Sequence, residues 1–501
     1  MITLSKAIIE ELMTNISTGN SNYYAFASNP VPVVGNTTVD TFDDYTVNFI
    51  SDWQMIFGKK LANTDLAPVI TDIPWTPNTV YSYYDNRNPY MPLLNFYVVT
   101  APVIGGGYNI YKCIDNANGA PSTYVPAQVQ QNSFTTLDGY TWRYITTITS
   151  ESYLKFASSN YIPVYQNTAI SSSAYKNSGI EKVVILNGGN GYSVSYNTGT
   201  IQSVTNTSLV QIANASSLDT YSLSSIYING SYSAELKNIV SYISNTSGNW
   251  VYLDTPLNPN NVTSSSSYII SPRVVFNSDA DAQPLAYSVV NVSSNSISSI
   301  VMVDSGYGMT WANVGIVTNQ LSAQPALMYP IIPPAGGHGA DPTNELYTKG
   351  FALAFSFANS EHGNVVTDAL YNKIGVMKNP YAISNTYSNS GVLYTANAFN
   401  QVLQTNIFPP VTFPTGTLVM GNSSNAVGTV AFSNTSVLYL TGDKYFSNGE
   451  YVTNGSNTTQ ITINKRASVY TKGIKPLYIQ NISNVTRSNT QTESYKLIIQ
   501  T

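Results

Sequence analysis

The residue types that most often carry out chemistry in proteins are scarce in this chain. It contains two histidines, His338 and His362, and neither lies in a His-X-X-X-His or cysteine-containing cluster. A transition-metal site would therefore need ligands gathered from distant parts of the sequence. His338 stands between Gly337 and Gly339, a setting typical of a turn residue that bonds backbone rather than of a ligand or base. We predict no metal site and no cofactor.

Other candidate centres are equally weak. Asp279 and Asp281 could offer oxygen ligands to Ca²⁺, but the glycine and the distal glutamate of an EF-hand loop are missing, which favours a solvated turn. No Gly-X-Ser-X-Gly elbow marks a nucleophilic serine. The glycine-rich segment 188–192 is not followed by a capped helix or by Lys-Ser/Thr, so it does not indicate a phosphate site. A chain with 26 acidic residues always contains two carboxylates that could be proposed for glycoside hydrolysis, so their presence does not indicate that activity. The chain is predicted not to be an enzyme.

Composition narrows the classes of partner. At 501 residues the chain should form two to four domains. Charged residues make up 9% of it, against a usual share of about 25%, and the net charge is −5. This balance gives no basic surface for nucleic acid and no polybasic patch for a membrane. Asn, Ser, Thr and the 39 tyrosines must cover the surface, which suits permanent protein contacts.

The single cysteine and the N-terminal residues bear on the cellular compartment in which the protein folds. Cys113 lies inside an apolar stretch and excludes an intrachain disulfide, so we predict a small, buried packing residue. Lys6, Glu10 and Glu11 interrupt the first apolar residues, so no signal-peptide core is present. No uncharged apolar run approaches the ~20 residues of a membrane span. We expect a soluble chain that is not exported by the standard route.

The chain is organised around residues 75–164. Large residues alternate with smaller ones over 108–114, which predicts a strand with one packed face. Asp138-Gly139 fits a turn, because glycine adopts positive φ without steric cost. The next strand then places three rings on one face, at Tyr140, Trp142 and Tyr144. We predict that Tyr140 and Trp142 are mostly buried and anchor the core.

Two helices are predicted near the N-terminus, and helices become rare after them. Apolar residues recur at helical spacing over 4–16, between a capping Ser5 and a terminating Gly19. A second helix is predicted over 43–57, with Gly58 and two lysines closing its C-terminal end. The segment 23–26 between them reads as a strand.

The remaining chain indicates two insertions into a discontinuous core. Short β runs separated by Asn, Gly and Ser fill 177–317, bracketed by two copies, at 180–192 and 297–307, of a strand that runs into a Gly-Tyr corner. The composition of the first part returns over 318–393, where alternating apolar residues predict a strand at 351–357. A second insertion is predicted over 394–464, and 465–501 supplies two strands joined by 487–491. The predicted fold class is mainly β with a minor α+β part. Its core domain, formed by 1–176, 318–393 and 465–501, carries a short N-terminal helical region and two inserted β-sandwich or barrel-like domains.

A series of landmarks occurs in a characteristic order along the chain. They are Trp75, Val80-Tyr81, Tyr84-Asp85, 96–99, 111–114, Asp138-Gly139-Tyr140 with Trp142 and Tyr144, 161–164, 336–339, Ile374-Gly375 with Asn379-Pro380, and 478–493. In these residues the chain resembles the baseplate wedge subunit of T4-like contractile-tailed bacteriophages, of the gene-eight product type. The resemblance covers both ends of the chain and leaves the two insertions uncovered.

The resemblance implies a structural, non-enzymatic protein of the phage virion. It implies a place in the tail baseplate after assembly in the host cytoplasm, a homodimer within each wedge, and other baseplate wedge proteins as partners. Nucleic acid, membranes, small-molecule substrates and cofactors are not expected. The residues expected to define the fold or the assembly contacts are Trp75, Tyr111, Cys113, Asp138, Gly139, Tyr140, Trp142, His338, Tyr478, Arg487, Gln491 and Glu493. We predict an assembly role for Arg487, against the alternative of a solvated hairpin turn over 487–491.

Two rival functions also fit a β-rich, weakly charged chain. A tail-fibre or tailspike-like protein that binds or cleaves host polysaccharide would show long stacked repeats, whereas this chain shows two isolated pairs of similar segments. A bacterial surface adhesin would carry a signal peptide, which the N-terminus does not indicate.

Overall fold

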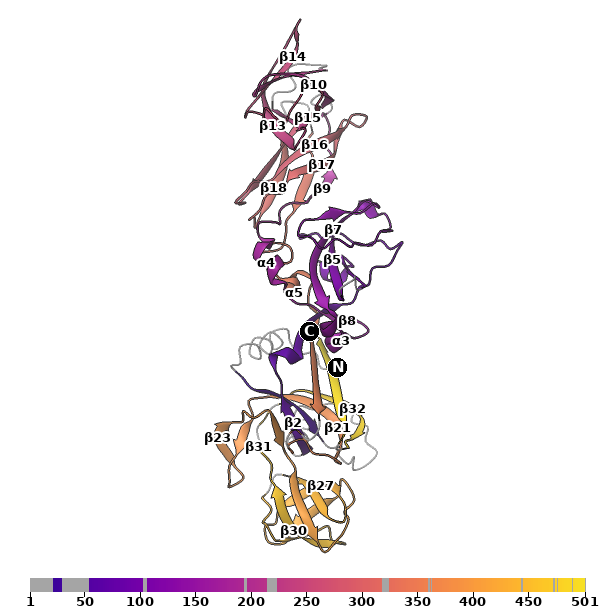
Figure 1. Cartoon of the computed structure of the whole chain (residues 1–501), viewed down its shortest axis with the longest axis vertical. Helices are drawn as coiled ribbons and strands as arrows, with labels where there is room; N and C mark the ends of the chain where they lie inside the picture. Colours follow the sequence, from indigo (N-terminus) through magenta and orange to yellow (C-terminus); the bar gives the residue numbers. More distant parts are fainter. Residues whose placement is uncertain are drawn as a thin grey trace. The chain divides into compact units, whose positions relative to one another are not determined.

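The computed structural model describes residues 21–28, 54–101, 106–192, 196–213, 223–317, 324–358, 361, 363–442, 445–471, 474, 476–488 and 490–500 (Figure 1). Strands make up 52% and helices 7%, which confirms the predicted mainly β fold class. The chain divides into two compact units: unit 1, Met1–Pro68 with Lys349–Thr501, and unit 2, Val69–Thr348. The predicted helices over 4–16 and most of 43–57 lie outside the described residues.

Unit 2 begins with a four-stranded antiparallel sheet in the order β4-β5-β7-β6. Its elements are η2 (Met91–Leu93), β4 (Tyr97–Thr100), β5 (Gly107–Asn116), η3 (Ala117–Gly119), β6 (Phe134–Thr135), β7 (Tyr140–Thr149), α3 (Ser150–Phe156), β8 (Tyr161–Pro163) and α4 (Thr168–Ala174). The predicted turn is present, with Gly139 at φ +85°. β5 differs from the prediction, because both its faces are buried. One face packs in an aromatic cluster, and segments from beyond residue 176 cover the other.

The rest of unit 2 is a two-stranded neck and a nine-stranded sheet, part of which closes into a barrel. The strands are β9 (Lys182–Asn187), β10 (Asn197–Asn206), β11 (Leu209–Ile212), β12 (Ser224–Asn229), β13 (Ala234–Asn245), β14 (Gly248–Leu253), β15 (Ser267–Ser278), β16 (Leu285–Asn291), β17 (Ser296–Asp304), β18 (Ala312–Val317) and β19 (Leu327–Ile331), followed by α5 (Pro342–Glu345). β9 pairs with β19 to form the neck, so the pairing extends beyond the predicted limit at 317. β10 pairs with both β11 and β15 and thereby closes β10–β15 into a six-stranded barrel.

The two Gly-Tyr corners predicted from the sequence are joined by reciprocal backbone hydrogen bonds. The amide of Ile180, at the start of the first copy, donates to the carbonyl of Ser305 in the second corner. In the same way the amide of Ile297, at the start of the second copy, donates to the carbonyl of Gly188. Gly189 and Gly306 hold nearly the same positive φ, +65° and +62°. The two copies therefore form one reciprocal structure at the neck.

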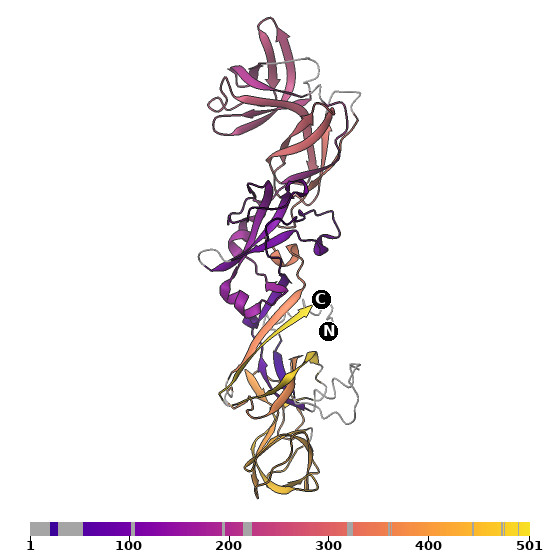
Figure 2. The ribbon, with the colours of Figure 1, turned by 90° about the vertical axis from the view of Figure 1, so that its right-hand side faces the viewer.

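Unit 1 consists of a sheet core and a second closed barrel (Figure 2). Its elements are β1 (Tyr23–Ser28), β2 (Met55–Lys60), η1 (Asn63–Asp65), β20 (Gly350–Ala358), β21 (Leu370–Lys378), β22 (Tyr381–Ile383), β23 (Asn389–Leu393), β24 (Ala398–Asn400), β25 (Leu403–Phe408), β26 (Leu418–Gly421), β27 (Val427–Ser433), β28 (Val437–Thr441), β29 (Tyr451–Thr453), β30 (Thr458–Lys465), β31 (Val469–Tyr470), β32 (Pro476–Thr486) and β33 (Thr492–Gln500). β3 (Leu66–Thr71) contains the boundary between the units. The strands predicted at 23–26, 351–357 and the C-terminus are confirmed as β1, β20, β32 and β33.

Two sequence expectations differ from this structure. Residues 55–57, predicted to end a helix, form β2, because pairing with β1 and β24 on both sides satisfies their backbone groups. The expected single core is divided between the units, since 69–176 and 318–348 pack with the first insertion while 349–393 and 465–501 belong to unit 1. No helix in the described part of the chain is long and apolar enough to cross a membrane.

Candidate functional site

Two cations lie side by side inside the four-stranded sheet of unit 2. Lys112 on β5 is directly opposite Arg143 on β7. Their side chains are 0% and 3% exposed. Like charges opposite each other destabilise a sheet, and burial removes the water that would screen them. Both cations therefore need acidic partners from outside the strand pair.

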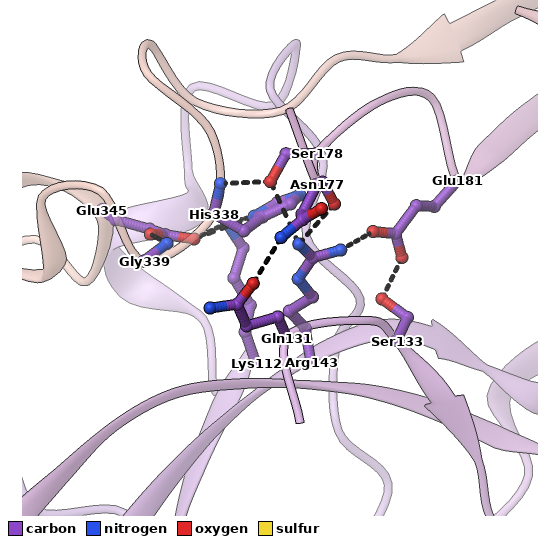
Figure 3. Close-up of polar contacts among 10 residues, drawn as sticks. All are labelled: Lys112, Gln131, Ser133, Arg143, Asn177, Ser178, Glu181, His338, Gly339 and Glu345. Carbon is purple, nitrogen blue, oxygen red and sulfur yellow. Dashed lines mark hydrogen bonds and ion pairs between the residues drawn. The ribbon is translucent and has the colours of Figure 1, made fainter. Parts of the chain in front are cut away.

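Those partners come from the two segments that flank the insertion (Figure 3). Nζ of Lys112 lies 2.7 Å from Oε1 of Glu345, at the end of α5. Arg143 pairs with Glu181, just before β9, and its Nη2 donates to the carbonyl of Asn177 at 2.6 Å. We call this cluster, made of Lys112, Arg143, Asn177, Ser178, Glu181, His338 and Glu345, the polar junction. It binds the segment at the start of the first insertion and the segment that follows the insertion to the same four-stranded sheet.

His338 lies at the centre of the polar junction. Its Nδ1 is 2.9 Å from Oε1 of Glu345 and 3.0 Å from Nζ of Lys112. Its backbone amide donates to Oγ of Ser178 at 2.9 Å. The turn predicted from the flanking glycines is present, with Gly339 at φ +82° donating to Glu345 at 2.6 Å. The imidazole, however, contacts charged side chains rather than backbone, which corrects the sequence interpretation.

Burial and pairing set the charges of the polar junction. Burial, followed by the nearby Lys112, lowers the pKa of His338 to about 4. Burial lowers the pKa of Lys112 to about 8, although Glu345 favours its charged form. Burial alone would raise the pKa of Glu345, but Lys112 and His338 outweigh it and hold that pKa at about 2. At neutral pH the carboxylate and the ammonium are charged and the imidazole is neutral. Both contacts are made by Nδ1, so the neutral ring donates to Glu345 in one tautomer or accepts from Lys112 in the other.

Further polar contacts join the sheet to the neck. The hydroxyl of Tyr329 on β19 donates to Asp85 at 2.7 Å. Nζ of Lys182 on β9 is 2.6 Å from Asp115 and 3.9 Å from the ring centre of Tyr83. β9 thus contacts the sheet through Asp115 on β5, and β19 contacts the loop that precedes the sheet through Asp85. In a chain with 9% charged residues, this concentration of charge marks the region.

The opposite face of the same sheet holds four of the twelve residues predicted to define the fold or the assembly contacts. Cys113, Tyr140 and Trp142 are each 0% exposed, as predicted, and Tyr111 lies in the same cluster. The rings of Tyr140 and Trp142 stack with centroids 5.4 Å apart. Burial raises the pKa of the Cys113 thiol well above its usual range.

Asp138 ties the connecting loops to this sheet. Its Oδ2 accepts from the amide of Thr123 at 2.7 Å and from Oγ of Ser122 at 3.1 Å, and Ser122 also accepts from Nε1 of Trp75. Partial burial alone would raise the pKa of Asp138, but hydrogen bonds from the hydroxyl of Thr136 and from the amides of Tyr124, Thr123 and Tyr140 outweigh it and lower the pKa to about 2. Asp138 and Trp75 thus act in loop structure.

The C-terminal candidates form a separate cluster in unit 1. Arg487 is 1% exposed, with Nε 2.6 Å from Oε2 of Glu493 and Nη2 bonded to the carbonyls of Phe357 and Gln491. The alternative of a solvated Arg487 is therefore wrong, although the amide of Gln491 does close a turn onto Ser488 at 3.2 Å. Tyr478 on β32 packs partly buried against the core of unit 1.

The polar junction is suited to holding structure. Its cations and its central Glu345 are nearly closed to solvent, so a substrate cannot reach them. In the part of the chain that the structure describes, no group of three or more His, Cys, Asp or Glu residues could hold a metal ion. Asp279 accepts from the amides of Thr310 and Trp311, and Asp281 accepts from Tyr175, which matches ordinary loop chemistry.

Sequence reasoning missed Lys112, Arg143, Glu181 and Glu345. A signal was present, because Lys112 and Arg143 each interrupt an apolar strand, and a cation in such a place requires a buried partner. The identity of the partners was not accessible, since Glu345 is 233 residues from Lys112. No protein-family model matches the chain, and no curated protein matches it.

Proposed function

We propose that this protein is a structural, non-enzymatic subunit of a phage tail baseplate wedge that holds neighbouring wedge proteins together. The observation that carries the proposal is the polar junction, which binds both ends of the insertion to a single sheet through buried charges. A side-chain network of this kind fixes one arrangement of the segments it joins. Such a fixed arrangement suits a subunit that must keep its contacts while a large assembly moves.

The positions of the resemblance landmarks support the same proposal. Tyr111, Cys113 and Trp142 are buried on one face of the sheet, and His338 is buried at the polar junction on the other. The landmarks of the resemblance that lie in unit 2 are therefore part of the interior of that unit. They are not grouped around an accessible pocket, as residues shared by an enzyme family would be.

The surface is also consistent with permanent assembly. Tyr90, Tyr232 and Tyr451 are 66%, 85% and 46% exposed, in a chain with few charges to keep protein partners apart. Exposed aromatic residues with little charge are typical of protein interfaces. We propose other wedge proteins as partners, a homodimer within each wedge, and a location in the virion.

The test is the composition of purified tail baseplates of the virus that encodes the chain. Quantitative mass spectrometry should find the chain in baseplates at a fixed ratio, in multiples of six copies per particle. Co-expression with the products of neighbouring genes should yield a stable sub-assembly containing it. Recovery of the chain with tail fibres instead, together with binding to host polysaccharide, would replace this proposal by the tail-fibre function.

A further inference from the structure

The turn that carries His338 is packed closely against α4. A Cβ added at Gly337 would lie 2.2 Å from the carbonyl oxygen of Ala174, and a Cβ added at Gly339 would lie 2.7 Å from the side chain of Ile170. Atoms cannot approach so closely, so the turn has no spare room on the side of α4. His338 itself is 3% exposed. Its side chain therefore cannot reach water unless the whole turn moves away.

The charged and titratable groups that face the imidazole of His338 come from four segments. They are Tyr84, which precedes β4, Lys112 on β5, Arg143 on β7 and Glu345 at the end of α5. The ring of Tyr84 stands edge-on to the imidazole, with the ring centres 5.7 Å apart. α4 presents only uncharged residues to the turn. The imidazole thus has two cations and one carboxylate as its charged neighbours.

The charges of the polar junction are balanced at neutral pH. Lys112 and Arg143 are positive, and their partners Glu345 and Glu181 are negative. A proton on His338 adds a third positive charge. Among the described residues Glu345 alone offers the ring a carboxylate, and it already pairs with Lys112. The protonated ring carries a hydrogen on Nδ1 and cannot accept from Nζ of Lys112, 3.0 Å away, so two cations then repel each other in a site closed to water.

Movement of the turn would affect both segments that flank the first insertion. The amide of His338 donates to Oγ of Ser178, which also accepts from Nη2 of Arg143 at 3.1 Å. The turn leads into α5, so Glu345 would move away from Lys112 together with it. Because Ser178 and Glu345 each take part in two contacts, the loss of one contact weakens the next.

The first barrel, in contrast, has a counterpart in unit 1. Around the first barrel the strands follow the order β11-β14-β13-β12-β15-β10, and around the second the order β25-β28-β27-β26-β29-β30, with every pair antiparallel. Matching strands follow one another in the same sequence, except that β10 comes first and its counterpart β30 comes last. One barrel is thus a circular permutation of the other.

Details of the two barrels also correspond. Residues 244–247 and 433–436 both read Ser-Asn-Thr-Ser, and in each turn the asparagine Oδ1 accepts from an amide two residues later at 2.8 Å. Gly230 and Gly421 stand at equivalent corners, where an added Cβ would lie 2.5 Å from the side chains of Asn261 and Glu450. The second barrel closes in unit 1 without the polar junction. We therefore expect the first barrel to stay folded when the contacts of the polar junction are lost.

We propose that the polar junction is a pH-sensitive switch, in which protonation of His338 releases residues 177–181 and 336–345 from the four-stranded sheet while the first barrel stays folded. The change is reversible, because no covalent bond forms or breaks. This inference does not rest on the proposed function.

The direction and size of the effect follow from linkage. The pKa of His338 is lowered from 6.5 to about 4 in the closed junction, and a released ring regains its ordinary pKa. The open state therefore binds the proton more readily between these values. The closed junction keeps its full stability above pH 6.5 and loses it as the pH falls towards 4. The open fraction should rise by at most about tenfold per pH unit and by about 300-fold in all.

Hydrogen–deuterium exchange of the purified full chain between pH 4 and 7, followed by mass spectrometry, tests the proposal. After correction for the pH dependence of exchange in unfolded peptides, protection at 177–181 and 336–345 should fall by up to about 300-fold at pH 4, whereas β12 and β15 should keep theirs. In His338→Gln the protection of these segments should not depend on pH. Ser178→Ala is the matched control, because it removes a contact of the turn and keeps the imidazole. It should lower protection at every pH and leave the pH dependence intact.

Three results would overturn the proposal. One is protection of 177–181 and 336–345 that does not change with pH in the wild type. Another is a pH dependence in His338→Gln equal to that of the wild type. A third is an equal loss of protection throughout unit 2, since acid would then unfold the whole unit instead of opening the polar junction.

Discussion

The ammonium of Lys112 lies 2.7 Å from the carboxylate of Glu345, with the two side chains 0% and 2% exposed. Replacement of one member of such a pair leaves the other charge buried without compensation, and this is the costly change. Replacement of both members by apolar or neutral groups of similar size removes the charges together. The two kinds of variant should therefore differ strongly in stability.

Glu345→Gln should lower the free energy of unfolding of unit 2 by about 3 to 5 kcal/mol, and the pair Lys112→Met/Glu345→Gln should recover most of that loss. Urea unfolding, followed by tryptophan fluorescence, measures both. Lys59→Met removes a cation that is 28% exposed in unit 1 and should cost at most about 1 kcal/mol. A double variant as unstable as the single one would contradict the explanation by uncompensated charge.

Acid should weaken unit 2 through His338. The pKa of this group is lowered from 6.5 to about 4, so between these values the unfolded chain binds a proton that the folded chain does not. The stabilising effect is present in full above pH 6.5 and is lost as the pH falls towards 4, with a slope on the order of 1 kcal/mol per pH unit. His338→Gln should flatten the plot of unfolding free energy against pH in this window. An unchanged slope in His338→Gln would contradict the assignment.

Trp142→Ala should cost about 3 to 5 kcal/mol, because the ring is fully buried against Tyr140 and Tyr81 and its loss leaves a cavity. Among the described residues Nε1 of Trp142 has no acceptor, so Trp142→Phe removes an unpaired donor and should cost less. Trp311→Ala is the control, since that ring is 43% exposed. Chemical unfolding of the three variants compares them. An equal loss in Trp142→Phe and Trp142→Ala would show that the ring volume is not what matters.

Arg487→Ala was expected from the sequence to fold and to assemble poorly. Because the side chain is buried against Glu493, we now expect a loss of about 3 to 5 kcal/mol in unit 1 as well. The double variant Arg487→Met/Glu493→Gln separates the two effects, since it should restore stability. If that variant folds normally and still fails to enter baseplates, the assembly role of Arg487 stands. Normal incorporation would limit Arg487 to folding.

Local patterns predicted the local structure well. Alternation along β5 and β7, the Asp138-Gly139 turn, and the burial of Cys113 and Trp142 depend on neighbours within a few residues or on side-chain type alone. Residues 55–57 show the limit of this reasoning. Their helical spacing continued that of the preceding residues, but pairing with β1 and β24 decided their conformation.

Long-range relationships could not be predicted in the same way. A buried cation indicates that an acid must be near, but no physical rule selects Glu345 over the other acids before the fold is known. The similarity of the two barrels could not be predicted from the sequence either. The strands follow the same order around each barrel, but the first strand of one corresponds to the last strand of the other, so the order along the chain differs. Only the Ser-Asn-Thr-Ser turns and the two glycine corners keep a visible trace of it.

The neck described above has a consequence for the order of events during folding. Pairing of β9 with β19 joins residues roughly 140 positions apart, whereas most strands of the first barrel pair over much shorter separations. Chain-closure entropy delays contacts of long separation, so the barrel should gain amide protection first and the neck last. In a newly synthesised chain the first barrel would then be folded while the segments on either side of it are still unpaired. The two Gly-Tyr corners would form their reciprocal hydrogen bonds only after these two segments have come together.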